Sequence, residues 1–147
     1  MSISVVIGLS AVVVAIRDGD AVVLTVRPHD AITDVASPLS GLPFGPFDPE
    51  THRTFELGLR AFVTAQTRFQ LGYVEQLYTF ADRGRSGEPD APHRISISYL
   101  GLTREEEGRE GADAQWSSWY DYFPWEDHRD GPPAMLTKII APKLKAW

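Results

Sequence analysis

The clearest structural pattern in the chain is FELGLRAFVTAQTRFQLGYVEQLYTFADRGR at residues 55–85, followed by RISISY at residues 94–99. Phe55, Leu59 and Val63 recur at helical spacing, which predicts one amphipathic helix over residues 52–68. Aromatic and β-branched residues then predict strands, because these side chains favour a pleated, half-buried surface. The expected strands cover residues 71–81 and 95–99.

Two details of the helix can be anticipated. Asp48 or Thr51 is the expected cap of its first turn, because a short polar side chain there can accept a free backbone N–H. Gly58 lies inside the helix, where glycine costs about 1 kcal/mol relative to alanine. We therefore expect close packing of another group against Gly58.

Towards the amino terminus, β-branched runs at 12–16 and 22–27 flank the dipeptide Asp18-Gly19. Asp-Gly between two such runs predicts a hairpin with a type I′ turn, which needs positive φ at both central positions. The first strand is expected to begin near Ser4. Residues 30–49 are rich in Ser, Pro, Gly and Asp, and predict a loop region with room for one short edge strand.

Beyond residue 81 we expect two loops and one helix. The polar segment 82–93 and the charged segment 104–115 predict loops. Pro132-Pro133 predicts a helix start, so residues 134–140 are expected to be helical, with Pro142 kinking or restarting the helix. This order of elements predicts an α+β fold, with a mixed sheet covered by helices in a single domain, 1–147.

Composition limits the function. The formal net charge of −6 argues against nucleic-acid binding by this domain alone. The chain contains no cysteine, which excludes disulfides, zinc–thiolate sites and cysteine nucleophiles. Residues 2–16 are apolar but lack a basic flank, and so predict a buried strand rather than a targeting segment. No run reaches the length of a membrane span, and we expect a cytoplasmic protein.

Motifs for catalysis are missing from the sequence. Four scattered histidines show no i, i+4 pair, and there is neither a G-x-S-x-G elbow nor a phosphate-binding glycine loop. The acidic run at 105–107 has no neighbour at ligand spacing and predicts a solvated loop. We therefore predict no catalytic residue, no metal ligand and no cofactor.

The segments GLPFGPFDPE at 41–50 and LRAFVTAQTR at 59–68 resemble the Nudix box, a glycine-rich loop followed by a helix with R-E-x-x-E-E-x-[TG]. Arg60 matches the arginine of that motif. Its glutamates fall on non-acidic residues, and its last glycine on Arg68. Those non-acidic residues are Ala61, Thr64, Ala65 or Gln66, according to a one-residue ambiguity of register. Pyrophosphate hydrolysis needs Mg²⁺ held by carboxylates, so the resemblance implies a binding scaffold without the hydrolase metal site.

A more specific resemblance rests on LGYVEQLYTFADRGR at 71–85 and ISISYL at 95–100. These segments are similar to the Nudix-related transcriptional regulators of NAD biosynthesis, of the alphaproteobacterial type. Further matching segments are LTVR at 24–27, FDP at 47–49 and FPWED at 123–127. Ala81 and Arg68 depart from that group, which usually has glycine at both positions.

The resemblance implies a Nudix-like α/β/α sandwich with a mixed β-sheet, acting as an N-terminal sensor domain for ADP-ribose or a related NAD metabolite. A winged-helix DNA-binding domain would follow residues 143–147, and is expected to be missing from this chain. DNA would be contacted only through that additional domain. We also expect a homodimer and no membrane partner.

A diphosphate bound without metal needs arginine forks and polar groups. The predicted ligand-binding residues are Arg27, Arg60, Glu75, Gln76, Tyr78, Arg83, Gly84 and Arg85. Alternatives remain open: Arg83 and Arg85 in a solvated turn, Arg60 in a structural ion pair, and Glu75 and Gln76 facing solvent. The aromatic cluster at 116–125 would stack a nucleobase, close the core or form a dimer surface, and we favour the last two.

Three functions follow from these patterns. We favour a non-catalytic ligand-sensing domain of a transcriptional regulator of NAD metabolism. The alternative is a metal-dependent Nudix hydrolase of ADP-ribose-like nucleoside diphosphates, in which Glu50, Glu56 and Glu75 replace the missing acids. The third is a homodimerisation module without a small ligand.

Overall fold

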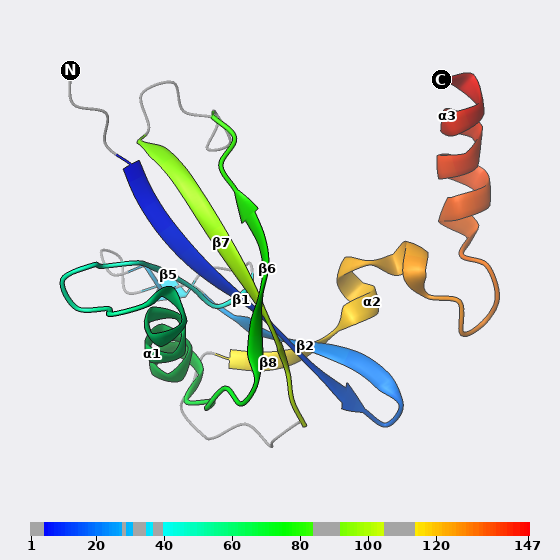
Figure 1. Cartoon of the computed structure of the whole chain (residues 1–147). Helices are drawn as coiled ribbons and strands as arrows, with labels where there is room; N and C mark the ends of the chain where they lie inside the picture. Colours follow the sequence, from blue (N-terminus) through cyan, green and yellow to red (C-terminus); the bar gives the residue numbers. More distant parts are fainter. Residues whose placement is uncertain (1–4, 28, 31–34, 37–39, 84–91, 105–113) are drawn as a thin grey trace.

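A computed structural model describes residues 5–27, 29–30, 35–36, 40–83, 92–104 and 114–147 of the chain. The main sheet has the strand order β6-β7-β1-β2-β8, and β5 pairs with β1 beside β2 (Figure 1). Its strands are β1 (Val5–Arg17), β2 (Asp20–Val26), β5 (Phe44–Pro46), β6 (Val74–Phe80), β7 (His93–Leu102) and β8 (Ala114–Ser118). β1 and β7 are parallel and the other pairs are antiparallel, so the predicted mixed sheet is confirmed.

The amino-terminal hairpin forms as expected. Asp18 and Gly19 have φ of 51° and 92°, the two positive values that a type I′ turn requires. Arg17 pairs with Asp20 across the turn, and β1 begins at Val5, next to the expected start. In the loop region, β5 is the expected short strand. A small hairpin of β3 (His29–Asp30) and β4 (Val35–Ala36) adds to it.

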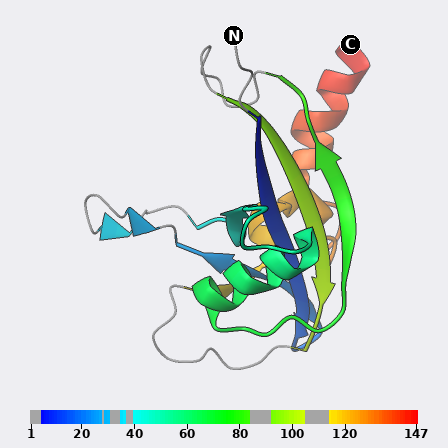
Figure 2. The same cartoon turned by 60° about the vertical axis from the view of Figure 1, so that its left-hand side comes forward.

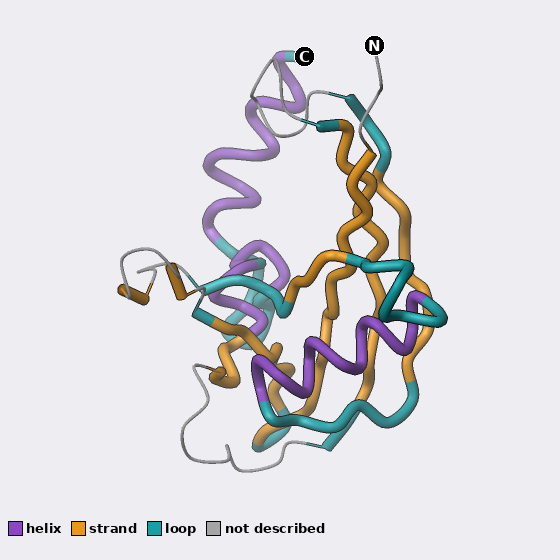
Figure 3. Tube along the Cα trace, turned by 90° about the vertical axis from the view of Figure 1, so that its left-hand side faces the viewer, coloured by secondary structure: helices purple, strands orange, loops and turns teal. Residues whose placement is uncertain are grey.

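Helix α1 (Phe55–Thr67) packs across one face of the sheet, as Figure 3 shows. Leu59 and Val63 are fully buried there. They meet alternate residues of β1, because side chains at i and i+2 of a strand point to the same face. The β1 residues of this core are Leu9, Ala11 and Val13. Gly58 also fits its prediction: a Cβ at Gly58 would lie 3.0 Å from the His52 ring.

The predicted caps of α1 were wrong, and the helix starts three residues later than expected. Thr54 is the cap, and its Oγ1 accepts a hydrogen bond from the Leu57 N–H at 3.2 Å. Asp48 and Thr51 belong to a separate turn, in which the Asp48 carbonyl accepts from the N–H groups of Thr51 and His52. Because Thr51 and His52 belong to this turn, they cannot join the helix, which begins at Phe55.

The sequence analysis did not predict β8, because the first residues of this strand fall in the segment 104–115 that was predicted to be a loop. Its sequence AQWSS has little β-branched character, and its conformation comes from pairing with β2, with Leu24 opposite Trp116. Trp116 then packs edge-on against Phe69, with ring centroids 6.0 Å apart. Tertiary pairing therefore overrides the local preference of this segment.

The remaining helical segments follow β8. They are α2 (Trp119–Tyr122), η1 (Pro124–Glu126), the π-helical segment η2 (Leu136–Ile140) and α3 (Ala141–Ala146). The helix predicted at 134–140 is confirmed, but it continues to Ala146. Its wide turn immediately precedes Pro142, which relieves the clash of the proline ring with the carbonyl four residues earlier. No helix within the described residues is long and apolar enough to cross a membrane.

Residues 134–146 form one continuous helix that stands away from the sheet, on the side opposite α1 (Figures 1 and 2). We call it the C-terminal helix. The short α2 lies beside β2 and β8, so the face of the sheet opposite α1 is only partly covered.

The packing of α1 makes a direct prediction about stability. Leu59→Ala is expected to lower the free energy of unfolding by about 2–5 kcal/mol, because it leaves a cavity under α1. Leu57→Ala is the matched control, since the Leu57 side chain of the same helix is 51% exposed. Urea denaturation followed by tryptophan fluorescence measures both. Equal losses for the two variants would contradict this assignment of the core.

Candidate functional site

Arg60 of α1 bonds to the loop that precedes β6 and so holds the two elements together. Its guanidinium pairs with Glu56 one turn earlier, with Nη2 and Oε1 2.8 Å apart. Nη1 donates to the Leu71 carbonyl, and Nη2 donates to the Gly72 carbonyl at 2.7 Å. The structure thus shows the ion pair that the sequence left open. A ligand role for Arg60 remains a prediction.

Of the four helix positions that match the Nudix glutamates, two carry polar side chains, and both of these have structural partners. The Gln66 amide brackets Phe44 of β5: its Nε2 donates to the Phe44 carbonyl at 2.7 Å, and its Oε1 accepts from the Phe44 N–H at 3.3 Å. The Thr64 hydroxyl donates to the Phe69 carbonyl at 3.3 Å. The other two positions, Ala61 and Ala65, have no polar side-chain atom. Thr64 and Gln66 point to different sides of α1, and each holds a neighbouring backbone segment in place.

The three acids of the hydrolase alternative occupy separate settings. Glu50 lies in the exposed turn before α1, and Glu56 pairs with Arg60. Glu75 accepts a hydrogen bond from the Tyr73 hydroxyl at 3.1 Å, which raises the pKa of the Tyr73 phenol. Within the described ranges, no three His, Cys, Asp or Glu side chains are grouped as a metal ion would require.

The predicted ligand residues of β6 do not all face the same way. Gln76 pairs with Tyr99, whereas Tyr78 pairs with Ser98, so β6 carries one extra residue between these pairs. This bulge puts Glu75 and Tyr78 on one face of the sheet, although residues three apart in a regular strand point to opposite faces. Gln76 lies on the α1 face, where its Nε2 donates to Thr79 Oγ1 at 3.1 Å.

The predicted arginines are spread over the fold. Arg83 follows β6, at one edge of the sheet. Arg27 follows β2, which β7 and β1 separate from β6. Arg60 lies on α1, and the structure brings none of these three into a common fork. Gly84 and Arg85 lie outside the described residues.

A group of side chains that the sequence analysis missed surrounds Tyr78. The Tyr78 and Phe80 rings lie 4.6 Å apart, and the register places them opposite Ser98 and Ser96. Arg94 belongs to the same face of β7, as the residue two positions before Ser96. We call Glu75, Tyr78, Phe80, Arg94, Ser96 and Ser98 the β6–β7 patch.

Two contacts position this patch against β1 and β5. The Arg94 guanidinium lies 5.9 Å from the centroid of the Phe44 ring. The hydroxyls of Ser98 and Ser10 are hydrogen bonded at 2.8 Å. Gly8 leaves room for the Phe44 ring, since a Cβ there would lie 2.4 Å from its edge. The alternation Arg94, Ser96, Ser98 in the sequence was the signal that β7 has a polar face.

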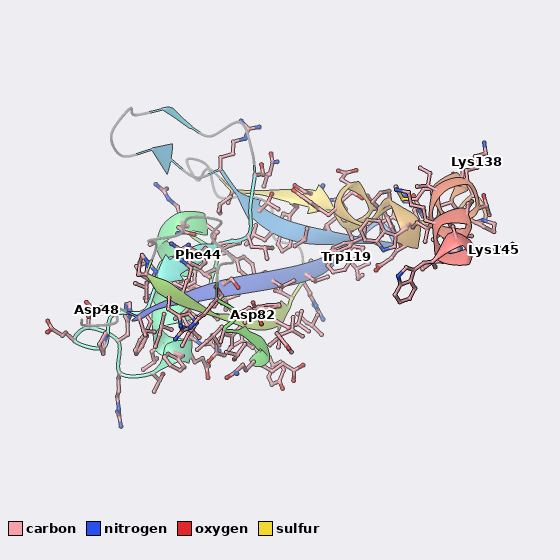
Figure 4. All side chains as sticks on the ribbon, turned by 90° about the horizontal axis from the view of Figure 1, so that it is seen from above. Phe44, Asp48, Asp82, Trp119, Lys138 and Lys145 are labelled. Atoms are coloured by element: carbon pink, nitrogen blue, oxygen red, sulfur yellow. The ribbon has the colours of Figure 1, made fainter. Side chains whose placement is uncertain are left out.

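The patch combines an aromatic pair, a guanidinium, hydroxyls and a carboxylate on one open sheet face. Aromatic rings can stack on a base, and arginine forks suit phosphates. A carboxylate can accept hydrogen bonds from sugar hydroxyls. These groups together suit a nucleotide. Figure 4 shows Phe44 and Asp82, which follows β6, in the half of the molecule away from the C-terminal helix.

The aromatic cluster after β8 forms a separate unit. Trp119 stacks on Phe123 at 4.6 Å, and its Nε1 donates to Glu126 Oε2 at 2.7 Å. Arg129 lies 4.4 Å from the centroid of the Tyr120 ring. None of α2 or η1 is buried in the described structure, so of the cluster only Trp116 packs against the main core.

Arg129 also links this unit to the sheet through Asp20, and it pairs locally with Asp127. Its Nη1 lies 2.5 Å from Asp20 Oδ2 in β2, and its Nη2 lies 2.8 Å from Asp127 Oδ2. The hydrogen bonds from Arg129 lower the pKa of Asp127 from 3.8 to about 2. We call this arrangement the Arg129 clasp.

The clasp predicts a pH dependence of stability. The folded pKa of Asp127 is below its unfolded value, so its stabilising effect is complete above about pH 4 and disappears as the pH falls towards 2. Asp127→Asn should therefore lower the melting temperature at pH 7, with the difference from wild type shrinking below pH 4. Melting curves measured from pH 2 to 7 test this. Asp121→Asn is the control, and a pH-independent effect of Asp127→Asn would contradict the mechanism.

Comparison with solved structures defines the class of the fold, which is Nudix-like and α+β. The Nudix domain of Shewanella oneidensis NrtR, solved with ADP ribose, is similar with a TM-score of 0.65 and 19% identity. The alignment covers 96% of this chain and 88% of that one. A mutT/nudix family protein from Listeria innocua has a TM-score of 0.58 at 15% identity, with 99% and 97% of the two chains covered.

A second, longer chain of Shewanella oneidensis NrtR is also similar, with a TM-score of 0.64 and 20% identity. The alignment covers 80% of this chain. The aligned part is 53% of that NrtR chain, and NrtR has also been solved with a 27mer DNA. No protein-family model matches this sequence, and no curated protein matches it. At these identities the likeness establishes the fold.

Proposed function

We propose that this chain is the ligand-sensing domain of a transcriptional regulator of NAD metabolism, which binds ADP-ribose or a related nucleoside diphosphate without hydrolysing it. The observation that carries the proposal is the chemistry of α1. At the positions of the Nudix glutamates it has Ala61, Thr64, Ala65 and Gln66, of which the two polar residues hold neighbouring backbone. A Nudix-like scaffold with these residues favours binding over metal-assisted hydrolysis.

The β6–β7 patch is the surface we assign to the ligand. The base would stack on Tyr78 and Phe80, and Arg94 would meet the diphosphate. Arg83 follows β6 at the same edge of the sheet and would add a second guanidinium for the diphosphate. Gly84 and Arg85 remain predicted ligand residues outside the described structure. We place Arg27, Arg60 and Gln76 outside the patch, because they lie at other edges or faces of the fold.

The regulatory part of the proposal rests on likeness to NrtR. This chain spans about half of that NrtR, whose solved complexes contain ADP ribose in one case and DNA in another. We propose that DNA is contacted through an additional domain in the cytoplasm. Ligand binding controls such contact only if the ligand has different affinities for two states of the regulator.

Calorimetric titration with ADP-ribose, with and without Mg²⁺, tests the proposal. We expect metal-independent binding, with no AMP detectable afterwards by chromatography. Arg94→Ala should weaken the affinity at least about tenfold, because a charge-assisted pair with the diphosphate is lost. Arg104→Ala is the matched control, since Arg104 follows the opposite end of β7.

Other outcomes would favour the alternatives. Mg²⁺-dependent production of AMP would contradict the sensor and support a hydrolase that uses Glu50, Glu56 and Glu75. Flat titrations with a correctly folded domain would favour a homodimerisation module without a small ligand. Equal loss of affinity in Arg94→Ala and Arg104→Ala would contradict the assignment of the patch.

A further inference from the structure

Two apolar surfaces are incompletely covered in the described structure, one on a helix and one on the sheet. On the C-terminal helix, Leu136, Ile140 and Leu144 follow each other at four-residue spacing, so they form a stripe. Ile139 extends the stripe and is 50% exposed, and Leu144 is 65% exposed. In the described structure, neither helical segment of 136–146 contains a buried residue. An amphipathic helix of this kind is stabilised by covering its apolar side.

The second surface lies on the sheet, on the face opposite α1. The parallel register of β1 and β7 pairs Val12 with Leu100 and Val14 with Leu102. Ile16 continues the same face of β1, where it is 63% exposed, and Leu102 is 61% exposed. We call these five residues the apolar ladder. At roughly 1.5 Å per residue, the C-terminal helix spans about 20 Å, enough to cover the ladder.

The chain's own helix is held away from this face. The Arg129 clasp fixes the chain to β2 at Asp20, immediately before the helix. Only residues 130–133 connect the clasp to the helix, and Pro132 and Pro133 in that link have restricted φ. Figures 1 and 4 show the helix, with Lys138 and Lys145, projecting beyond α2. Gly131 in the same link has a φ of 102°, so it is the short length of the link that limits folding back. A link of four residues favours docking on another molecule.

Charge also favours a second copy of this chain as the partner. The helix carries Lys138, Lys143 and Lys145 and no acidic residue, whereas the whole chain has a formal net charge of −6. Glu75 lies on the same face as the ladder, directly opposite Leu100. The cationic helix would therefore approach an acidic molecule.

We propose that the C-terminal helix of one copy docks on the apolar ladder of a second copy, in a reciprocal exchange that produces a homodimer. Each copy then supplies the helix that completes the second layer over the partner's sheet. A two-fold exchange is closed, so assembly stops at the dimer. The interface does not require a ligand, and the inference is independent of the proposed function. Ser98 of the β6–β7 patch is two residues from Leu100, so the docked helix lies next to that patch.

Sedimentation velocity of the complete chain without ligand tests the exchange. We expect a dimer for the wild type, and dissociation constants at least about a hundredfold higher for Leu144→Asp and for Leu102→Asp, because each puts a charge into one half of the interface. Ala134→Asp, on the side of the same helix away from the stripe, and Leu57→Asp on α1 are matched controls that should remain dimeric. Circular dichroism confirms folding, and Leu144→Ala gives a milder version of the same test.

Mixing Leu144→Asp with Leu102→Asp distinguishes a dimer formed by reciprocal helix exchange from a dimer formed through any other surface. Each variant retains one intact half, so an equimolar mixture of Leu144→Asp and Leu102→Asp should form a heterodimer that neither forms alone. A wild type that stays monomeric at high concentration would overturn the proposal. So would variants that dimerise like the wild type, or a mixture that remains monomeric.

Discussion

The burial of Leu59 and Val63 against alternate residues of β1 sets which face of the sheet becomes the core. Because side chains alternate along a strand, fixing Leu9, Ala11 and Val13 under α1 sends their neighbours to the other face. The parallel pairing with β7 extends this division across the sheet. One face thus becomes the core, and the other becomes the surface on which both the candidate site and the apolar ladder lie.

The second consequence of this arrangement concerns α1 itself. Its buried side is determined by packing, and polar residues on either flank of that side bond to neighbouring backbone. Arg60 holds the loop before β6, and Gln66 holds β5. In this chain the helix that resembles the Nudix box thus works as a structural brace. The side chains that we assign to the ligand, such as Arg94 of β7 and Tyr78 of β6, lie instead on the face of the sheet opposite α1.

The open face is divided by the nature of its side chains. Near the start of β7 it carries Arg94, Ser96 and Ser98, and near its end it carries Leu100 and Leu102. The polar half suits a nucleotide, and the apolar half suits a helix. A ligand on the first half and a partner helix on the second would be neighbours along one strand. Coupling of metabolite binding to dimer geometry would require the ligand to have different affinities for two arrangements of this face.

The local elements follow from short-range patterns in the chain. Asp18-Gly19 specified the turn, the spacing of Leu59 and Val63 specified α1, and alternation specified β7, because each depends on neighbours in the chain. The absence of the Nudix glutamates from α1 was also evident from the sequence. The tertiary structure alone decided the strand character of β8, the bulge that reorients Tyr78, and the separation of Arg27 from β6. These features depend on partners distant in sequence, since a strand's pairing and register are chosen by the sheet it joins.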